Sequence, residues 1–344
     1  METAQSVLLK YWGHTSFREG QEQAITNILH DIDTMVLLPT GGGKSICFQV
    51  PALLKPGICI VISPLIALME DQVLALNNKG IKALHLGGNL GIMELRRLLD
   101  NALYGEYKFL YLSPERLQNE LVQETIRNLP VSLVAIDEAH CISQWGNDFR
   151  PSYNKIPEIR NLIGNVPFIA LTATATPKVV EDTMQLLEMK NPELVQTSFY
   201  RPNLSYETYS VSDKLKAIQQ IIQSKPGPAI LYIRSRKGTA SHSKHLNSLG
   251  IKSTFYHGGL NTEEKNKRLH SWLNEETPVM VATNAFGMGI DKANVRHVIH
   301  LQIPESIESY FQEAGRAGRD GKPARAILLY DDYDPTRTLH QYTR

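Results

Sequence analysis

Short apolar segments alternate with stretches of helical periodicity along almost the whole of this 344-residue chain. Such alternation predicts an α/β fold with parallel sheets, because each parallel strand pair needs a crossover that packs on the sheet. The helix expected over Leu65–Lys79 is typical, since apolar residues recur on one face and Gly80 can adopt a left-handed cap. In the first half we expect strands at Met35–Leu38, Ile58–Ser63, Ala83–Leu86, Phe109–Leu112, Leu133–Asp137 and Phe168–Thr172.

The pattern weakens between Lys190 and Asn203, where two prolines occur and no periodicity is clear. At roughly 100–200 residues per domain the length suggests two domains, which we place at residues 1–198 and 199–344. A second series of strands is expected at Ala229–Ile233, Thr254–Tyr256, Val279–Ala282, Val298–Leu301 and Ala326–Tyr330. Its helices are expected at Lys214–Ser224, Gly238–Leu249, Thr262–Leu273 and Ser306–Arg316.

The net charge of +1 by itself argues against a nucleic-acid partner, but it hides an uneven distribution. Residues 1–198 hold 16 basic and 21 acidic residues, and the rest hold 20 and 14, so the two parts carry −5 and +6. The segment Lys225–Arg268 contains nine basic residues and only two acidic residues, Glu263 and Glu264. This segment is either a solvated basic face or a surface that binds phosphates.

Cys47, Cys59 and Cys141 are an odd number without CxxC spacing, which predicts neither a disulfide framework nor a zinc site and favours a reducing compartment. No apolar run approaches the roughly 20 residues that span a bilayer, and the N-terminus lacks the features of a secretion signal. A cytoplasmic protein is expected.

A glycine-rich turn, Thr40, Gly41, Gly42 and Gly43, connects a predicted strand to a helix that starts with Lys44 and Ser45. Glycines let backbone N–H groups approach phosphates, the lysine reaches the terminal phosphates, and the serine offers a hydroxyl to Mg²⁺. Leu38 stands where the strict form of this motif has glycine, so the loop alone does not identify a nucleotide site.

Two carboxylates, Asp137 and Glu138, end another apolar strand, and His140 follows. Acids at the carboxyl end of a parallel strand face the ligand crevice, where Asp137 suits the Mg²⁺ shell and Glu138 suits activation of a water molecule. His140 either starts a helix or couples to Thr172–Thr174, which should lie nearby.

The segment Gln312–Gly321, QEAGRAGRDG, carries Arg316 and Arg319 in a glycine-rich setting near the other end of the chain. Surface arginines are usually solvated, but two at this spacing can also supply an arginine finger to a phosphoryl-transfer site.

Nine motifs together resemble the catalytic core of the RecQ family of superfamily-two DNA helicases, over nearly the whole chain. They are FREGQ at Phe17–Gln21, PTGGGKS at Pro39–Ser45, SPLIALMEDQ at Ser63–Gln72, SPERL at Ser113–Leu117, DEAHCISQWGNDFRP at Asp137–Pro151, ALTATAT at Ala170–Thr176, FYRPNL at Phe199–Leu204, ATNAFGMGID at Ala282–Asp291 and QEAGRAGRDG.

The resemblance implies two RecA-like domains with MgATP bound between them, Lys44 and Gln312 among the catalytic residues, and Ser45 and Asp137 at the Mg²⁺. It implies that Arg18 and Gln21 recognise adenine. It also implies an aromatic-rich loop in which Trp145, Phe149 and Arg150 link single-stranded DNA to the ATP site. An ATP-dependent DNA helicase of 3′ to 5′ polarity would follow, acting on single-stranded and forked DNA in recombination and repair. Single-strand-binding protein would be a partner, and in a bacterium the nucleoid would be the location.

Family members usually continue into a zinc site and a winged-helix domain, so this chain is either part of a longer protein or a minimal member. In both cases we expect ATPase activity and no zinc site, whereas unwinding could be poor. Three alternatives stay open: an RNA-dependent ATPase or helicase of the same superfamily, a strand-annealing module without hydrolysis, and a nucleotide switch that binds protein only.

Overall fold

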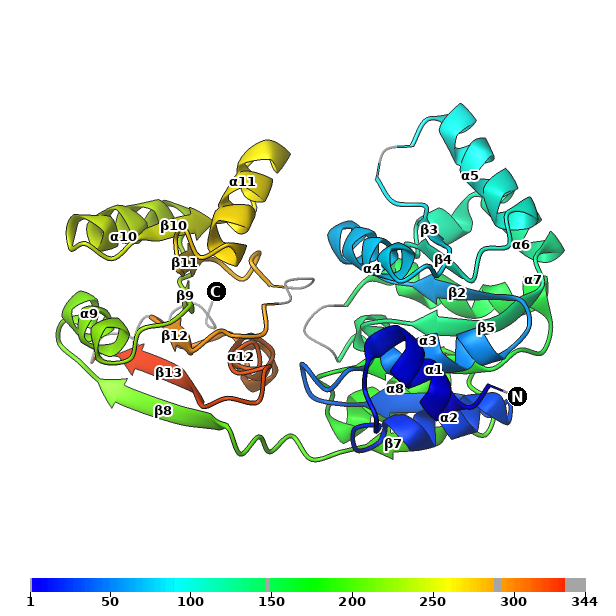
Figure 1. Ribbon diagram of the computed structural model, residues 1–344, viewed down its shortest axis with the longest axis horizontal. Coiled ribbons are helices and arrows are strands. Elements are labelled where there is room, and N and C mark those ends of the chain that lie inside the picture. The colour runs from blue at the N-terminus through cyan, green and yellow to red at the C-terminus, as the bar shows by residue number, and fades with distance from the viewer. Residues whose placement is uncertain (1, 89, 146–148, 288–291, 332–344) are drawn as a thin grey trace. The chain divides into compact units, whose positions relative to one another are not determined.

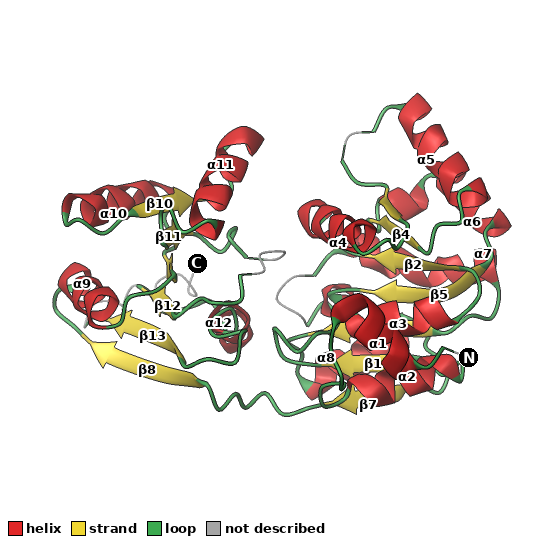
Figure 2. Ribbon diagram, in the orientation of Figure 1, coloured by secondary structure: helices red, strands yellow, loops and turns green. Residues whose placement is uncertain are grey.

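The computed structural model describes residues 2–88, 90–145, 149–287 and 292–331, and it divides into two compact units, Met1–Phe199 and Tyr200–Arg344 (Figure 1). The boundary falls one residue after the position expected from the sequence. Each unit is a single β-sheet covered by helices (Figure 2).

The first unit contains a seven-stranded sheet in the order β3-β4-β2-β5-β6-β1-β7, and every strand pair in it is parallel. Because β6 lies between β5 and β1, the loops that follow these three strands emerge at one edge of the sheet. The strands are β1 (Thr34–Leu37), β2 (Ile58–Ile62), β3 (Ala83–His85), β4 (Phe109–Leu112), β5 (Val131–Ile136), β6 (Phe168–Thr172) and β7 (Glu193–Gln196).

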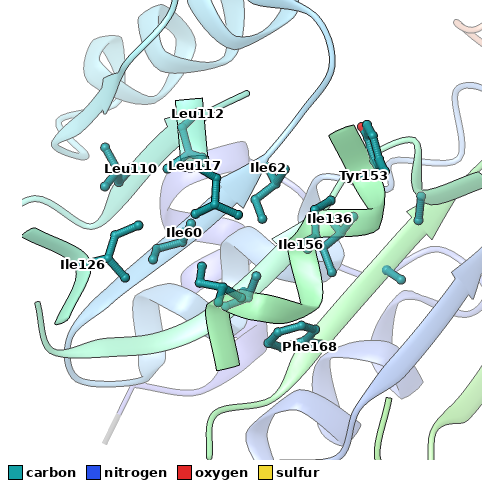
Figure 3. Packing of buried hydrophobic residues seen from close by; sticks show 14 of the residues in the cluster. Ile60, Ile62, Leu110, Leu112, Leu117, Ile126, Ile136, Tyr153, Ile156 and Phe168 are labelled. Carbon is teal, nitrogen blue, oxygen red and sulfur yellow. The ribbon is translucent and has the colours of Figure 1, made fainter. Parts of the chain in front are cut away.

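Both faces of this sheet are buried, because successive side chains of a strand point to opposite sides. Ile60 and Ile62 of β2 belong to one apolar cluster, and Cys59 and Val61 belong to the other. Figure 3 shows the first cluster, in which strand side chains pack against Ile126 and Ile156. The helices are α1 (Ala4–Trp12), α2 (Gln21–Leu29), α3 (Ile46–Leu54), α4 (Ile66–Asn78), α5 (Ile92–Tyr104), α6 (Glu120–Asn128), α7 (Arg160–Ile163) and α8 (Pro177–Leu186). Three 3-10 helices cover Arg116–Gln118, Ala139–Ile142 and Pro151–Ile159.

The second unit repeats the architecture with a six-stranded parallel sheet in the order β10-β11-β9-β12-β13-β8. Side chains of α9 and α10 pack on one face, and those of α11 and α12 pack on the other. The strands are β8 (Leu204–Ser210), β9 (Ala229–Tyr232), β10 (Ser253–Tyr256), β11 (Val279–Ala282), β12 (His297–His300) and β13 (Ala324–Tyr330). The helices are α9 (Lys214–Ser224), α10 (Arg236–Ser248), α11 (Thr262–Leu273) and α12 (Ile307–Ala314).

The expected α/β class with parallel sheets is confirmed, and the segment Lys190–Asn203, where the apolar pattern weakens, is found to contain a strand that the sequence did not indicate. This segment contains β7, and β8 begins directly after it. Only Val195 in β7 and Leu204 in β8 are buried, because both are edge strands held mainly by backbone hydrogen bonds. Apolar periodicity therefore could not reveal them.

Three further expectations concern the cysteines, membrane-spanning helices and metal sites. All three cysteines are buried and free. In the described ranges no helix has both the length and the apolar character needed to cross a membrane. Across the same residues, no group of three or more His, Cys, Asp or Glu side chains is arranged to hold a metal ion.

Candidate nucleotide and nucleic-acid sites

The glycine-rich loop follows β1 and leads into α3, which begins at Ile46, with Ser45 as its N-cap residue. Gly41 and Gly43 have φ angles of 82° and 75°, in the left-handed region that glycine adopts without steric cost. A Cβ at Gly42 would lie 2.9 Å from the carbonyl oxygen of Pro39. The loop backbone is thus compact and left-handed at two positions, as a phosphate-binding turn requires.

Gln21 and Arg18, the residues expected to recognise adenine, lie against this loop. The Gln21 side-chain amide donates hydrogen bonds to the carbonyl oxygens of Gly42 (3.2 Å) and Gly43 (3.0 Å). Its own carbonyl oxygen accepts from the Arg18 backbone N–H at 2.9 Å, and the Arg18 guanidinium donates to the Gly41 carbonyl. The start of α2 therefore holds the phosphate loop, a contact that the motif itself did not indicate.

Asp137 and Glu138 stand directly after β5, at the edge of the sheet that also carries the phosphate loop. Burial, together with the neighbouring Glu138 carboxylate, raises the pKa of Asp137 to about 7, while the Lys44 ammonium opposes this shift. Glu138 has a φ of 47°, a left-handed conformation that costs energy for a residue with a side chain. The strained turn brings two carboxylates and one lysine together.

His140 lies at the start of the 3-10 helix Ala139–Ile142, and its side chain contacts both Glu138 and the end of β6. Its Nδ1 lies 2.7 Å from the Thr172 hydroxyl and 3.4 Å from Glu138 Oε2. Because Nδ1 holds at most one hydrogen, the shorter contact with Thr172 is the hydrogen bond. Oε2 of Glu138 is buried and has no hydrogen-bond partner within the part of the chain that the structure describes. A buried carboxylate oxygen in this state, beside an aspartate with a raised pKa, fits a site for a divalent cation.

The segment that follows the acids is only partly described, because Gly146, Asn147 and Asp148 lie outside the described residues. Trp145 is 65% exposed, which excludes a core role, and the Lys178 ammonium lies 3.3 Å from its ring centroid. The Arg150 guanidinium donates to the Pro64 carbonyl at 3.0 Å, while Phe149 is half-buried. Arg150 thus connects this segment to the turn before α4.

The two finger candidates of the second unit differ in exposure. Arg316 is only 5% exposed and hydrogen-bonds the Tyr232 hydroxyl, whereas Arg319 and Gln312 are half-buried. Glu313, next to Gln312, contacts His300 Nε2 at 2.7 Å. Arg316 is therefore packed inside its own unit, and Arg319 is the more accessible of the two arginines.

The basic segment Lys225–Arg268 includes all of α10 and the first part of α11. Arg268, at its end, stacks on Phe255, with its guanidinium carbon 3.7 Å from the ring centroid. Six of the nine basic side chains are exposed, and they are Lys225, Arg236, Lys237, Lys244, Lys252 and Lys267. Much of this charge is consequently available to an anionic partner.

Two family models match the chain. Residues 18–183 match the DEAD/DEAH box helicase family, and residues 213–321 match the helicase conserved C-terminal domain. The first match contains the phosphate loop and both acids, and the second contains Arg316 and Arg319. Two parallel-sheet units with this distribution of residues define the two-domain core of a helicase.

Comparison with curated relatives narrows the class of helicase to one family. The chain is 42% identical over 334 residues to the probable ATP-dependent DNA helicase RecS of Bacillus subtilis, covering 96% of this chain and 67% of that protein. It is 44% identical over 337 residues to ATP-dependent DNA helicase RecQ of the same organism, covering 97% of this chain and 57% of that protein. The chain belongs to the RecQ family of helicases, and it spans about half to two thirds of the length of these relatives.

Solved structures agree on the fold. The helicase MrfA bound to DNA and AMPPNP matches with a TM-score of 0.81 at 19% identity, covering 100% of this chain and 52% of that chain. The helicase Lhr of Mycobacterium smegmatis, bound to single-stranded DNA and AMP-PNP, matches with a TM-score of 0.77 at 20% identity, covering 94% of this chain and 47% of that chain. Both units are RecA-like domains, and family membership implies ATP and Mg²⁺ as cofactors.

Proposed function

We propose that this chain is the motor core of a DNA helicase that couples DNA-stimulated ATP hydrolysis to 3′ to 5′ movement along single-stranded DNA. Unwinding of forked duplexes during recombination and repair would follow from this movement. The supporting observation is the convergence of the phosphate loop, the paired acids and the His140–Thr172 contact at one edge of the first sheet. ATP hydrolysis requires a phosphate cradle, a cation site and a group that activates water, and this edge offers all three.

Each residue at this edge receives one role. The backbone from Thr40 to Gly43 and the Lys44 ammonium bind the phosphates, and Ser45 and Asp137 hold the Mg²⁺. When bound, MgATP supplies the phosphoanhydride bond that is broken. Glu138 orients the attacking water and accepts its proton. His140 couples the protonation state of this carboxylate to Thr172.

Recognition of the base is assigned to Gln21 and Arg18. In the structure both are engaged with carbonyl oxygens of the phosphate loop. We propose that adenine competes for these donors, so that base recognition and phosphate binding act on one loop.

The second unit contributes positively charged side chains. Arg319, assisted by Gln312 and the buried Arg316, stabilises the negative charge that develops on the transferred phosphoryl group. The exposed basic residues of α10 and α11 bind the DNA backbone, and Trp145 and Phe149 stack on bases without sequence preference. Single-strand-binding protein is proposed as a partner, and the cytoplasm or bacterial nucleoid as the location.

The test is ATP hydrolysis by this 344-residue chain with no nucleic acid, with single-stranded DNA or with single-stranded RNA, together with unwinding of a forked duplex. We expect strong stimulation by DNA and weak stimulation by RNA. Equal or greater stimulation by RNA would favour the RNA-dependent alternative, and absence of hydrolysis would favour the annealing module. Unwinding only of duplexes with a 3′ single-stranded tail would support the proposed polarity.

A matched variant tests the aromatic-rich loop. Trp145→Leu should weaken single-stranded DNA binding and stimulation while leaving DNA-independent hydrolysis near that of the unmodified protein, because a leucine cannot stack on a base. Trp12→Leu, a change of the same residue type in α1, serves as the control. Equal DNA stimulation in the unmodified protein and in Trp145→Leu would remove Trp145 from the DNA site.

A further inference from the structure

Arg201 makes an unusual set of contacts with the segment that carries the proposed arginine finger. Its Nη1 donates to the carbonyl oxygen of Gly315 at 2.9 Å. Its Nη2 donates to the carbonyl oxygens of Ala317 at 2.7 Å and Gly318 at 2.6 Å. One guanidinium therefore binds three carbonyls in the four residues that precede Arg319.

These carbonyls lie after α12, which ends at Ala314, so they are outside the hydrogen-bond pattern of the helix and need other donors. The planar guanidinium offers several donors in a fixed fork, so one side chain can serve several acceptors. A lysine at this position would bring a single ammonium and could not reproduce the fork. Arg201 thus stabilises the backbone path after α12.

Asn203 holds the same segment from an adjacent position. Its side-chain amide donates to the carbonyl oxygens of Gly318 at 2.7 Å and Lys322 at 2.9 Å. Gly318 has a φ of 60°, and a Cβ there would lie 2.6 Å from the Asn203 amide nitrogen. The turn immediately before Arg319 consequently depends on both residues and on the absence of a side chain at position 318.

The other end of the segment is held from within the sheet. Glu313 contacts His300 of β12 at 2.7 Å, and Arg316 bonds Tyr232 of β9. These contacts determine where the helix ends, but none of them reaches the residues between Arg316 and Arg319. That stretch is bound by the side chains of Arg201 and Asn203, and the Gly318 N–H also donates to the Val295 carbonyl at 2.9 Å.

We propose that Arg201 is a positioning residue for Arg319, which makes the orientation of the arginine finger depend on the first residues of the second unit. Arg201 lies two residues after Phe199, where the first unit ends. The proposal rests on the proposed catalytic role of Arg319. Arg201 itself touches no substrate in this scheme, and it acts only through the backbone that carries Arg319.

The experiment compares Arg201→Gln with Arg325→Gln in DNA-stimulated hydrolysis. Arg325 is the matched control, because it is a partly buried arginine of the same unit that pairs with Glu207 and has no contact with the finger segment among its hydrogen bonds. A displacement of about 1 Å in a catalytic group can cost roughly 10²-fold in rate. We expect a kcat loss of that order for Arg201→Gln, an ATP KM within about twofold, and near-normal kinetics for Arg325→Gln.

Two more variants separate positioning from folding. Arg201→Lys should recover part of kcat because its ammonium can still reach one carbonyl. The double variant Arg201→Gln with Arg319→Ala should be no slower than Arg319→Ala alone, since both changes remove the same interaction. The Tm of thermal unfolding is measured for all variants. A fall in Tm larger than that of Arg325→Gln identifies a loss of activity that follows from instability.

The outcomes distinguish failure of the positioning role of Arg201 from failure of the finger role of Arg319. If Arg319→Ala lowers kcat while Arg201→Gln does not, or if the two losses multiply in the double variant, Arg201 does not position the finger. If Arg201→Gln is destabilised and Arg201→Lys, folded normally, recovers no activity, the role is structural and the proposal is overturned. If Arg319→Ala itself keeps a normal kcat, the finger assignment fails, and the positioning role fails with it.

Discussion

The two units share one architecture and differ in what their loops carry. In the first unit the loops after β1 and β5 hold glycines, a lysine and two carboxylates, and the unit is acidic overall. In the second unit the loop after the central strand β9 leads through Arg234 and Ser235 into the basic helix α10. Parallel sheets offer the same crevice at their carboxyl edges, so the residues placed there decide the chemistry.

Two carboxylates show the same contrast. Asp137 of the first unit is held beside Glu138, a like charge, and its pKa is raised. Glu207 of the second unit is hydrogen-bonded by Arg325, and its pKa is lowered to about 2. A carboxylate whose ionised form is unfavourable until a cation binds is typical of a binding site. A carboxylate paired with arginine is typical of a structural contact.

The largest expected effect comes from the second unit. Arg319→Ala should lower the DNA-stimulated kcat by about 10³ to 10⁵-fold, the range for arginine fingers, because the charge on the transferred phosphoryl group loses its counter-charge. ATP affinity, measured by equilibrium binding, should change little. Arg325→Ala, which removes an arginine paired with Glu207, is the control. A kcat near that of the unmodified protein would show that the second unit supplies no finger from this position.

In the first unit, Glu138→Gln should lower turnover by about 10² to 10⁴-fold, as expected for loss of a general base. Binding of ATP should persist, because the phosphate loop and Asp137 are untouched. Single-turnover hydrolysis and nucleotide binding measured on one preparation separate the two effects. Normal turnover in this variant would refute the assignment of Glu138.

The carboxylates of the two units should respond to pH in opposite directions. A proton on Asp137 competes with Mg²⁺, so affinity for MgATP should fall about tenfold per pH unit below pH 7 and be constant above it. In metal-free protein the raised pKa means that Asp137 costs stability as pH rises from its ordinary 3.8 towards 7. Asp137→Asn should therefore be more stable than the unmodified protein at about pH 8, with a difference that shrinks towards about pH 4.

Glu207 supplies the comparison for this test. Its lowered pKa means that its ion pair stabilises the fold above its ordinary 4.5 and loses this effect as pH falls towards 2. Glu207→Gln should therefore be less stable than the unmodified protein at about pH 7, and the difference should shrink in acid. Denaturant unfolding at several pH values measures both variants, and parallel curves for the two would contradict the assigned environments.

The smallest effect concerns the charge difference between the units. Lys237→Glu with Lys244→Glu on α10 should weaken single-stranded DNA binding and lower its salt dependence, by roughly 0.7 in logarithmic slope for each phosphate that is no longer neutralised. Lys190→Glu, an exposed lysine of the first unit, is the control. Fluorescence anisotropy across salt concentrations gives both quantities. Equal slopes in all variants would make the basic face of α10 a merely solvated surface.

The inner strands were predictable from the sequence because they are continuous apolar runs. The bounds expected for β4, β6 and β11 agree with the structure, and each of these strands is buried at every residue. The edge strands β7 and β8 were not predictable, because their exposed faces remove the periodicity that marks a strand. Their position follows from pairing with β1 and β13, which lie far away in the sequence.

The candidate site likewise contains features that the sequence indicated and contacts that it did not. Local motifs identified the phosphate loop, the acids and the finger segment, because each of these is contiguous and its residue types are dictated by the chemistry of phosphate and Mg²⁺. No motif indicated that Gln21 binds the carbonyls of the loop, or that Arg201 binds those before Arg319. Both contacts join a side chain to backbone oxygens, and a carbonyl carries no residue identity for a sequence pattern to reveal.

By itself the sequence determined the fold class, the division near residue 200, the uneven charge and the residues to which ATP chemistry is assigned in the proposal. These properties are local, since they depend on apolar periodicity, on glycine conformations and on ionisable groups within short segments. Only the tertiary structure decided that Asp137 has a raised pKa, that Arg316 is buried while Arg319 is accessible, and that Arg201 holds the finger segment. Those properties arise from burial and hydrogen bonds between distant segments, which exist only after the chain has folded.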